Sequence, residues 1–405
     1  MQRGRSGTAL ACMGGTPRAR MRIAYITDTY PPEVNGVALT VVRTVRHLRE
    51  HGHVVDLIRP HQPSAVADPS GREWLTRGMR LPMYPDLRFG LAWPAALRRR
   101  FEAGWPDLVH LATPGPLAWS ALRAARALGV PVSSDFRTNF HRYSGYYHLG
   151  AFAPLVLAVL RQVHNRTDRT FVPTAELARE LGAAGFRRLT VLGRGVDTAL
   201  FRPDRRRAEL RSAWGANDDT PVLLSVGRVA AEKNIGLTLR AFRVLQRQRP
   251  DARLVVVGDG PLRAALEPAH PQVRFLGMRR GEELAACYAS ADLFCFPSLT
   301  ETFGNVTLEA LASGLPVVAY DIAAAAEHVR SGVSGLLVPP GDEAAFEGAV
   351  CALAADPARL ASMRAAAVAA AQGARWDDVL ARFERHLQDI VDGQQAPSEA
   401  AAFVA

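Results

Sequence analysis

Lysine is almost absent from this sequence of 405 residues. Of the 49 basic residues, 48 are arginine, and the one lysine is Lys233. Arginine presents a planar fork of donors, whereas lysine presents a compact ammonium on a flexible stem, so the two residues are not interchangeable. We therefore expect Lys233 to occupy a position that requires a point charge. Chance use of a single lysine is the alternative.

Cysteine is also scarce, and its spacing excludes several classes of protein. The four cysteines lie far apart and form no CxxC pair; they are Cys12, Cys287, Cys295 and Cys351. Such a pattern favours reduced thiols in a cytoplasmic protein and argues against a metal site built from cysteine.

No long hydrophobic run is present. The longest apolar stretch, residues 149–160, is too short to span a bilayer, and it contains Gly150 and Pro154. Residues 1–20 contain four arginines but no apolar segment typical of a signal peptide. We interpret these twenty residues as a disordered tail or a misassigned start, because a clean strand pattern begins at Met21.

The basic residues gather in the first half of the chain. Residues 1–200 contain 27 arginines and 14 acidic residues, whereas residues 201–405 contain 22 basic and 25 acidic residues. A basic half is compatible with nucleic acid, an anionic membrane or a phosphorylated substrate. Neither an aromatic-interleaved basic platform nor a helix-turn-helix pattern is present, so nucleic acid ranks last among these partners.

Short apolar runs alternate with helical patterns along the whole chain, which predicts an α/β protein with parallel sheets. The length suits two domains. In the first half we expect strands at residues 22–27, 54–58, 108–111, 130–134, 169–173 and 189–192. In the second half we expect strands at residues 222–226, 253–257, 273–276, 293–296, 317–320 and 336–338. The arginine-rich segment 201–220 reads as a linker and entry helix.

The most informative stretch is residues 297–316, which read PSLTETFGNVTLEALASGLP. A strand end, a glycine-containing loop and a helix start follow one another here, and the free N–H groups of a first helical turn bind anions. Glu301 and Glu309 flank that loop, although carboxylates would repel a bare phosphate. The combination points to a ligand with both phosphates and hydroxyls, such as a nucleotide sugar. An ordinary βα unit with two solvent-facing glutamates is the alternative.

Two further loops of the second half lead to the same edge of the sheet. Arg228 and Lys233 follow one strand, and the tight turn of residues 257–261 follows the next. Both cations can reach a diphosphate from a strand-to-helix turn. Because loops after parallel strands share one sheet edge, we expect these residues to lie near Glu301 and Glu309. A solvated basic face is the competing interpretation.

The first half contains two comparable loops. Gly36 follows the first strand and begins a helical pattern at Leu39, Val42, Val45 and Leu48, although the dinucleotide fingerprint GxGxxG is absent. A tight turn without a ligand is the alternative.

The other loop is residues 135–141, a polar cluster after a parallel strand, where open α/β sheets bind ligands. His141 in this loop is a candidate base, a hydrogen-bond donor or an ordinary surface histidine.

These motifs resemble those of retaining glycosyltransferases with the GT-B fold, in the group called family 4. The resemblance covers about residues 21–392 and rests on PPEVNGVALTV, GRVAAEKN, VGDGP and, above all, ETFGNVTLE. It implies two Rossmann-like, doubly wound domains that face each other across a cleft. The implied parts are an acceptor domain over residues 21–200, a donor domain over 201–375, a helix over 376–393 that crosses back to the first domain, and a flexible tail over 394–405.

The resemblance also implies roles for individual residues. Arg228 and Lys233 would hold the donor diphosphate and the charge that develops on it, Glu309 would bind the ribose hydroxyls, and Glu301 would lie near the transferred sugar. Gly36 would let the first domain close on the diphosphate. The other implied donor-binding residues are Gly258, Met278, Phe303, Gly304, Asn305 and Val306.

Two features concern cofactors and the donor. No DxD motif is present, so we expect neither a metal nor another cofactor, with protein cations stabilising the leaving group instead. Many relatives carry a histidine where this chain has Arg137, and that histidine is expected to contact the transferred sugar. Either Arg137 makes this contact, or His141 replaces it, or the donor preference differs.

The sequence therefore predicts a cytoplasmic enzyme that moves a hexose from a nucleotide diphosphate sugar to a lipid or glycan acceptor. We favour mannose from GDP-mannose over glucose or a related hexose from a UDP-sugar. A sugar-nucleotide epimerase and a non-catalytic sugar-nucleotide binder stay open, whereas a glycosidase would leave the cationic loops without a task. Residues 98–100 and 149–161 are candidate contacts with the anionic inner face of the plasma membrane.

Overall fold

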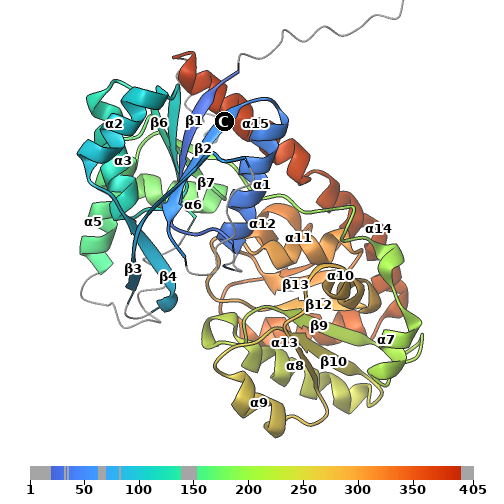
Figure 1. Ribbon diagram of the computed structural model, residues 1–405. Coiled ribbons are helices and arrows are strands. Elements are labelled where there is room, and N and C mark those ends of the chain that lie inside the picture. The colour runs from blue at the N-terminus through green and yellow to red at the C-terminus, as the bar shows by residue number, and fades with distance from the viewer. Residues whose placement is uncertain are drawn as a thin grey trace, which may run out of the picture.

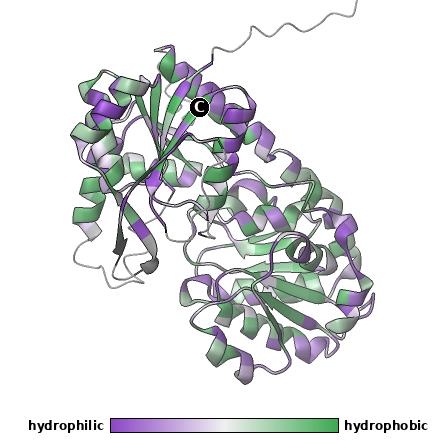
Figure 2. Cartoon of the chain, viewed as in Figure 1, coloured by the Kyte–Doolittle hydropathy of each residue, from purple (hydrophilic) through white to green (hydrophobic). Residues whose placement is uncertain are grey.

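The computed structural model describes residues 20–31, 33, 36–62, 70–81, 84–137 and 153–393. It contains two α/β units, each built on one central sheet covered by helices (Figure 1). The expected pair of doubly wound domains is confirmed. The apolar colouring in Figure 2 is concentrated on the strands and on the helix faces that cover them, as two separate cores require.

The first sheet has eight strands in the order β4-β3-β2-β1-β5-β6-β7-β8. All neighbours are parallel except β3 and β4. The strand order reverses at β1, and ligands bind beyond the carboxyl ends of the strands at such a switch point. The strands are β1 (Arg22–Ile26), β2 (Val54–Pro60), β3 (Glu73–Leu81), β4 (Tyr84–Leu91), β5 (Leu108–Leu111), β6 (Val132–Asp135), β7 (Arg169–Val172) and β8 (Leu189–Val191).

The second sheet has six parallel strands in the order β11-β10-β9-β12-β13-β14, which reverses at β9. The loops after β9, β10 and β12 are therefore neighbours at one edge of the sheet. The strands are β9 (Val222–Val226), β10 (Arg253–Val257), β11 (Arg274–Gly277), β12 (Leu293–Phe296), β13 (Val317–Tyr320) and β14 (Gly335–Val338).

The antiparallel hairpin of β3 and β4 was not expected from the sequence. Its strands contain Arg77, Arg80, Pro85 and Arg88, so they do not read as buried strands. β4 is the edge strand of the sheet, and edge strands tolerate charge and proline because one side of the ladder is free.

Helices fill the connections between the strands. In the first half they are α1 (Gly36–Glu50), α2 (Pro94–Gly104), α3 (Pro116–Ala127), α5 (Ala153–His164) and α6 (Ala175–Ala183). In the second half they are η2 (Pro203–Arg205), α7 (Ala208–Ala213), η3 (Ala231–Lys233), α8 (Ile235–Gln248), α9 (Arg263–Ala269), α10 (Gly281–Ser290), α11 (Asn305–Ala312), α12 (Ala323–His328), α13 (Glu343–Ala354), α14 (Pro357–Gln372) and α15 (Trp376–Val391). No helix in the described ranges is both long enough and apolar enough to cross a bilayer.

Helix α1 begins at Gly36 as expected, but its buried face is rotated from the expected one. Val45 and Leu48 are buried, and Ala38 and Val41 complete that face. Leu39 is instead 55% exposed. The repeat of large apolar residues identified the helix correctly, but the smaller Ala38 faces the core.

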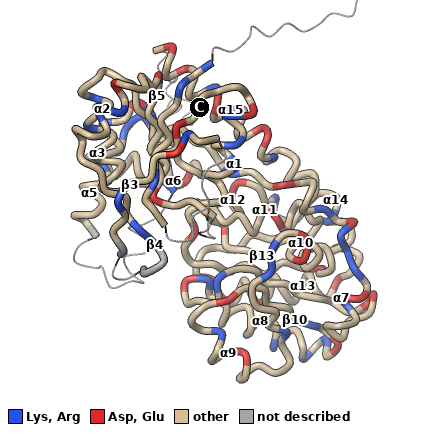
Figure 3. The backbone as a smooth tube through the Cα atoms, viewed as in Figure 1, with Lys and Arg blue, Asp and Glu red and all other residues tan. Residues whose placement is uncertain are grey.

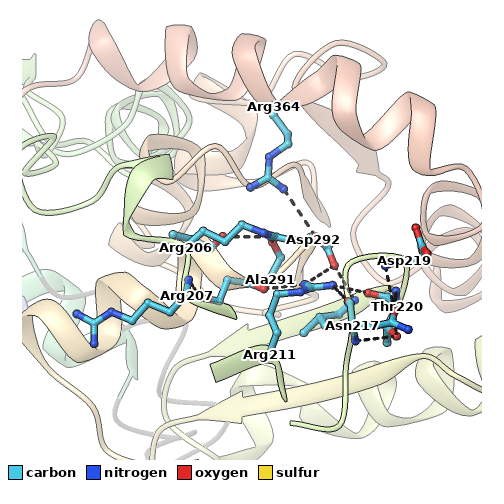
Figure 4. A network of polar contacts seen from close by, with 12 residues as sticks. Arg206, Arg207, Arg211, Asn217, Asp219, Thr220, Ala291, Asp292 and Arg364 are labelled. Atoms are coloured by element: carbon cyan, nitrogen blue, oxygen red, sulfur yellow. Dashed lines mark hydrogen bonds and ion pairs between the residues drawn. The ribbon is translucent and has the colours of Figure 1, made fainter. Parts of the chain in front are cut away.

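The segment expected to be a linker is firmly packed on the second domain. The fully buried Arg211 donates to Asp292 and to the backbone oxygens of Ser290 and Thr220. Arg206 and Arg364 also pair with Asp292, at 3.0 and 3.8 Å. Figure 4 shows these arginines converging on Asp292, which gives Arg206 and Arg211 of this segment a structural role.

Helix α15 leaves the second domain and packs on the first (Figure 1). Phe383, Leu387 and Ile390 join the core cluster that contains Ile23 and Tyr25 of β1. Full burial of such a side chain stabilises by roughly 1.5–3 kcal/mol, so this contact ties the end of the chain to the first domain.

The two chain segments that connect the domains run side by side. The N–H of Val196 donates to the carbonyl of Ala374 over 2.8 Å, and Val196 forms a parallel bridge with Arg375. A Cβ on Gly195 would stand 2.5 Å from the Cα of Trp376, so only glycine allows this approach.

Candidate active site

The loops after β9 and β10 meet backbone to backbone at the edge of the second sheet. A Cβ on Gly258 would lie 1.9 Å from the carbonyl oxygen of Gly227, and a Cβ on Gly260 would lie 2.4 Å from that of Val229. Gly258 also has a φ of 137°, which favours glycine. These contacts pack the two loops into one surface beside the loop after β12.

The two expected cations lie on this surface and each has an acidic partner. Lys233 forms an ion pair with Glu301 of the loop after β12, and its ammonium lies 5.8 Å from the centre of the Phe296 ring. The Lys233 and Glu301 side chains are 19% and 10% exposed. Arg228 is half-exposed and lies 3.6 Å from Glu232.

The loop after β12 leads into α11 through Gly304, whose φ is 91°. No side chain of the described residues caps α11, whose N-cap residue is Gly304, which leaves the N–H groups of Asn305 and Val306 for an acceptor. Phe303 is buried against the core and Ala324 donates to its carbonyl, which fixes the loop in place. The side-chain oxygen of Asn305 is buried and accepts no hydrogen bond from the described residues.

Glu309 lies one turn further along α11. It accepts a 2.9 Å hydrogen bond from the hydroxyl of Tyr288. Burial raises the pKa of Glu309 to about 7, and the Tyr288 hydrogen bond and Arg43 oppose that shift only in part. A buried carboxyl group whose pKa is raised to about 7, beside loops that carry charged residues, is typical of functional sites.

The first domain reaches the same place through the start of α1. A Cβ on Gly36 would lie 3.4 Å from a guanidinium nitrogen of Arg194 and 3.5 Å from the side-chain nitrogen of Asn305. Gly36 of one domain and Asn305 of the other therefore face each other across the cleft.

Arg137 lies at the first-domain side, but its guanidinium is engaged. It donates to Asp135 over 2.6 Å, and Asp135 also contacts His110 at 3.1 Å. Arg137 and His110 hold the pKa of the buried Asp135 below its usual range, against the effect of burial. The backbone oxygen of Arg137 lies 3.5 Å from Arg194. His141 lies outside the described residues.

The remaining expected residues lie around this edge to different degrees. Met278 follows β11, which β10 and β9 separate from β12, and is 55% exposed. Val306 is partly buried in the first turn of α11. The structure thus brings Gly36, Arg228, Lys233, Gly258, Glu301, Gly304, Asn305 and Glu309 to facing edges of the two domains.

Comparison with known proteins accounts for this arrangement. Residues 34–200 match the family described as Glycosyltransferase Family 4, and residues 220–356 match the one described as Glycosyl transferases group 1. A protein of Mycolicibacterium smegmatis named GDP-mannose-dependent alpha-mannosyltransferase is 37% identical over 347 residues, which cover 84% of this chain and 90% of that protein. This chain belongs to glycosyltransferase family 4.

A further relative and a solved structure are also similar to this chain. The alpha-monoglucosyldiacylglycerol synthase of Streptococcus pneumoniae is 32% identical over 323 residues, which cover 74% of this chain and 71% of that protein. The structure of sucrose-phosphate synthase from Thermosynechococcus elongatus superposes with a TM-score of 0.75 at 20% identity, covering 93% of this chain and 100% of that one. The GT-B architecture is confirmed.

Sequence reasoning missed two residues of this glycosyltransferase site, Arg194 and Tyr288, and the role of a third, Asp135, which lies in the predicted polar loop 135–141. Arg194 contacts the Gly36 loop, Tyr288 holds Glu309, and Asp135 holds Arg137. Arg194 had a usable signal, because it follows the last strand of the first sheet in the segment Gly193–Asp197. Tyr288 had none, since it lies in the last turn of α10, 21 residues before its partner.

Proposed function

We propose that this family 4 protein is a retaining glycosyltransferase that moves mannose from GDP-mannose to a lipid or glycan acceptor, without a metal ion. The relative from Mycolicibacterium smegmatis, named for GDP-mannose and aligned over 84% of the chain, supports the choice of donor. The observation that carries the reaction class is the pairing of Lys233 with Glu301 beside the available N–H groups of α11.

In this proposal the diphosphate lies between Arg228, Lys233 and the start of α11. Glu301 keeps the Lys233 ammonium paired in a half-buried position when no diphosphate is bound. When the donor enters, its phosphate oxygens provide the counter-charge, and Glu301 lies beside the sugar. Glu309 accepts hydrogen bonds from the ribose hydroxyls, and the buried side-chain oxygen of Asn305 accepts one from a further hydroxyl of the donor.

The reaction consists of one bond made and one broken at the anomeric carbon. The acceptor oxygen bonds to that carbon on the face from which the diphosphate leaves, so the configuration is retained. The leaving phosphate oxygen accepts the acceptor's hydroxyl proton. Arg228 and Lys233 stabilise the negative charge that develops on the diphosphate, and preorganised charges of this kind are commonly the largest single contribution to catalysis.

A second candidate donor is a UDP-hexose, especially UDP-glucose. The relative named alpha-monoglucosyldiacylglycerol synthase supports glucose over mannose as the sugar. The family resemblance implies a histidine at the position of Arg137, in contact with the transferred sugar. Arg137 instead donates a hydrogen bond to Asp135, so it does not simply replace that histidine. The base and the sugar therefore need a direct test.

A basic and apolar face of the first domain supports peripheral binding to an anionic membrane. Arg123, Arg126, Arg166 and Arg188 line a basin of about 650 Å³ between α3 and α5. Figure 3 shows basic residues over the same domain, along α2, α3 and the β3–β4 hairpin.

Beside the basin, Leu155 and Val159 of α5 are 62% and 51% exposed. Basic groups contribute about 1 kcal/mol each near an anionic leaflet, so several of them with shallow apolar insertion give reversible binding. We propose the cytoplasmic leaflet, because Cys287, Cys295 and Cys351 are free thiols.

A thermal-shift screen against GDP-mannose, UDP-glucose, UDP-galactose and UDP-N-acetylglucosamine tests the donor assignment. We expect GDP-mannose to give the largest rise in melting temperature, because a ligand stabilises the state that binds it. A larger rise with UDP-glucose would assign the second candidate. Binding without turnover on any acceptor would favour a sugar-nucleotide binder, and release of an isomerised sugar nucleotide would favour an epimerase.

A further inference from the structure

A cluster of histidines lies at the end of α1 that is remote from the cleft. His47 and His51 are four positions apart, so they project from the same face of the helix, in its last turn and just beyond it. Glu384 of α15 reaches into this cluster. Figure 1 shows α1 and α15 side by side, so the cluster joins two segments that are more than 300 residues apart in the sequence.

The donor atoms of these three side chains converge on one point. Glu384 Oε2 lies 3.1 Å from His47 Nε2 and 2.5 Å from His51 Nδ1. All three donor atoms lie within 4.8 Å of one another. The Glu384 and His47 side chains are 3% and 11% exposed, whereas His51 is 45% exposed and opens the cluster to solvent.

A third histidine, His53, lies beside the other oxygen of the Glu384 carboxylate. His53 Nδ1 accepts a 3.1 Å hydrogen bond from the N–H of Met21, so a neutral His53 carries its proton on Nε2. That Nε2 lies 3.4 Å from Glu384 Oε1, is buried, and makes no hydrogen bond of ordinary geometry within the described residues. Glu384 Oε2, on the other side, is the oxygen shared by His47 and His51.

We propose that His47 Nε2, His51 Nδ1 and Glu384 Oε2 bind one Zn²⁺, with the fourth position open to water. Two imidazoles and one carboxylate form a donor set that Zn²⁺ takes in proteins. Zn²⁺ has ligand bonds of about 2.0–2.2 Å, which in a tetrahedron places the donor atoms roughly 3.3 Å apart. The pair of His47 and Glu384 nearly has this separation already.

The exposed His51 would have to move outward for the ion to fit. Its present 2.5 Å contact with Glu384 would lengthen by less than about 1 Å to reach tetrahedral spacing. The C-terminal end of α1 also carries the negative end of the helix dipole, which favours a cation there. His53 Nε2, 3.4 Å from Glu384 Oε1, lies where a group that orients a metal-binding carboxylate is expected.

The site would work as a clamp, separate from the transfer reaction. It would fasten α15 to α1, the helix that begins with Gly36 at the cleft. This inference does not rest on the proposed donor or acceptor, and the chemistry at the cleft stays independent of the ion. A purely hydrogen-bonded carboxylate, without an ion, is the rival account that the experiment must separate.

The test uses the full chain freed of any histidine tag and stripped of metal with a chelator. Co²⁺ is titrated as a visible probe, zinc content is measured by mass spectrometry after gel filtration, and melting temperature is recorded with and without Zn²⁺. The variants are His51→Ala, whose exposed position spares the core, and His47→Gln. The matched control is His270→Gln, which removes a histidine of the second domain.

We expect the parent and His270→Gln to bind about one Zn²⁺ per chain, to give the absorption of tetrahedral Co²⁺ and to melt at a higher temperature with Zn²⁺. His51→Ala should bind Zn²⁺ at least roughly 100-fold more weakly than the parent. Loss of a residue that only orients a metal ligand typically weakens metal binding by about 10–100-fold. A parent that binds no Zn²⁺ at micromolar concentration, or His51→Ala with unchanged affinity, would overturn the proposal. Folding of His51→Ala is checked by its melting curve without metal.

Discussion

Gly36, the first residue of α1, faces Asn305, the first residue of α11, across the cleft between the two domains. A Cβ at Gly36 would lie only 3.5 Å from the side-chain nitrogen of Asn305 and 3.4 Å from Arg194. Two helix starts from different domains thus point at one place. This relationship explains how two separate α/β units make one site.

The closeness at Gly36 predicts a graded response to side-chain size. Gly36→Ala should keep most of the activity, since 3.4–3.5 Å is an ordinary contact distance. Gly36→Val should weaken donor binding by roughly tenfold or more, because its extra methyls need about 1.4 kcal/mol or more of rearrangement. Gly236→Ala, at a position with open space around it, is the control. Donor affinity by calorimetry decides, and equal affinity for parent and valine variant would refute the close approach.

Loss of either cation should slow turnover far more than it changes stability. Arg228→Ala and Lys233→Ala should each lower kcat by roughly 10²–10³-fold, as expected for one preorganised stabiliser of developing charge. Lys233→Arg should also lose activity, because a planar fork does not replace a point charge paired with Glu301. Arg247→Ala, an exposed arginine of α8, is the control. Near-parental kcat in both alanine variants would remove the cations from the mechanism.

The raised pKa of Glu309 makes a pH-dependent stability prediction. Burial raises the pKa from 4.5 to about 7, so the folded protein disfavours the ionised form. The loss of folding stability that comes from ionising the buried Glu309 is absent below about pH 4.5, grows as the pH rises, and is complete above about pH 7. Glu309→Gln should therefore gain stability over the parent as the pH rises from 5 to 8, by about 1–3 kcal/mol after allowance for partial exposure.

Glu309→Gln should also bind the donor more weakly, because an amide oxygen accepts weaker hydrogen bonds from the ribose hydroxyls than a carboxylate does. The measurement is chemical denaturation of the unliganded protein at pH 5 and pH 8, with Glu283→Gln on the exposed face of α10 as the control. A stability difference that is the same at both pH values would contradict the burial of a titrating Glu309.

Metal removal should leave the chemistry at the cleft intact. With excess EDTA, donor cleavage should stay close to its untreated rate at a temperature well below melting, because Arg228, Lys233 and the start of α11 supply the positive charge. The melting temperature, in contrast, should fall if the histidine cluster holds Zn²⁺. Complete loss of cleavage that only Mg²⁺ or Mn²⁺ restores would mean a metal ion at the cleft.

Membrane binding should depend on salt and on α5. The parent should sediment with liposomes that contain acidic lipid at low salt and should be released at roughly 0.5 M salt, where charges are screened within a few ångströms. Val159→Asp should weaken this binding, and Val333→Asp, at a site 46% exposed on the second domain, should not. No sedimentation with acidic liposomes at low salt would point to a soluble acceptor.

Much of the fold could be predicted because parallel strands are buried on both faces and read as short apolar runs. Val222–Val226 and Leu293–Phe296 are examples, and the loops that follow them carry the motif residues. The β3–β4 hairpin escaped prediction because its outer strand, β4, is an edge strand that does not need an apolar pattern, and arginines interrupt the apolar pattern of β3. Contacts between distant segments escaped for another reason. The spacing of His47 and His51 suggests a shared face, but Glu384 reaches them only through the crossing of α15.

Function at single residues is harder to predict when a motif departs from its family. Arg137 could be placed at the site from its strand, but its engagement by Asp135 depends on the fold of the buried sheet. The loop that contains His141 lies outside the described residues, so its role stays a prediction.

The most direct test of the account follows radiolabelled GDP-mannose in the presence of the parent or Lys233→Ala and a bacterial lipid extract. The account predicts that the parent releases GDP in equal amount to a mannosylated lipid or glycan product with the α-configuration of the donor, whereas Lys233→Ala makes roughly 10²–10³-fold less. A β-linked product, or GDP release that yields only free mannose, would contradict it.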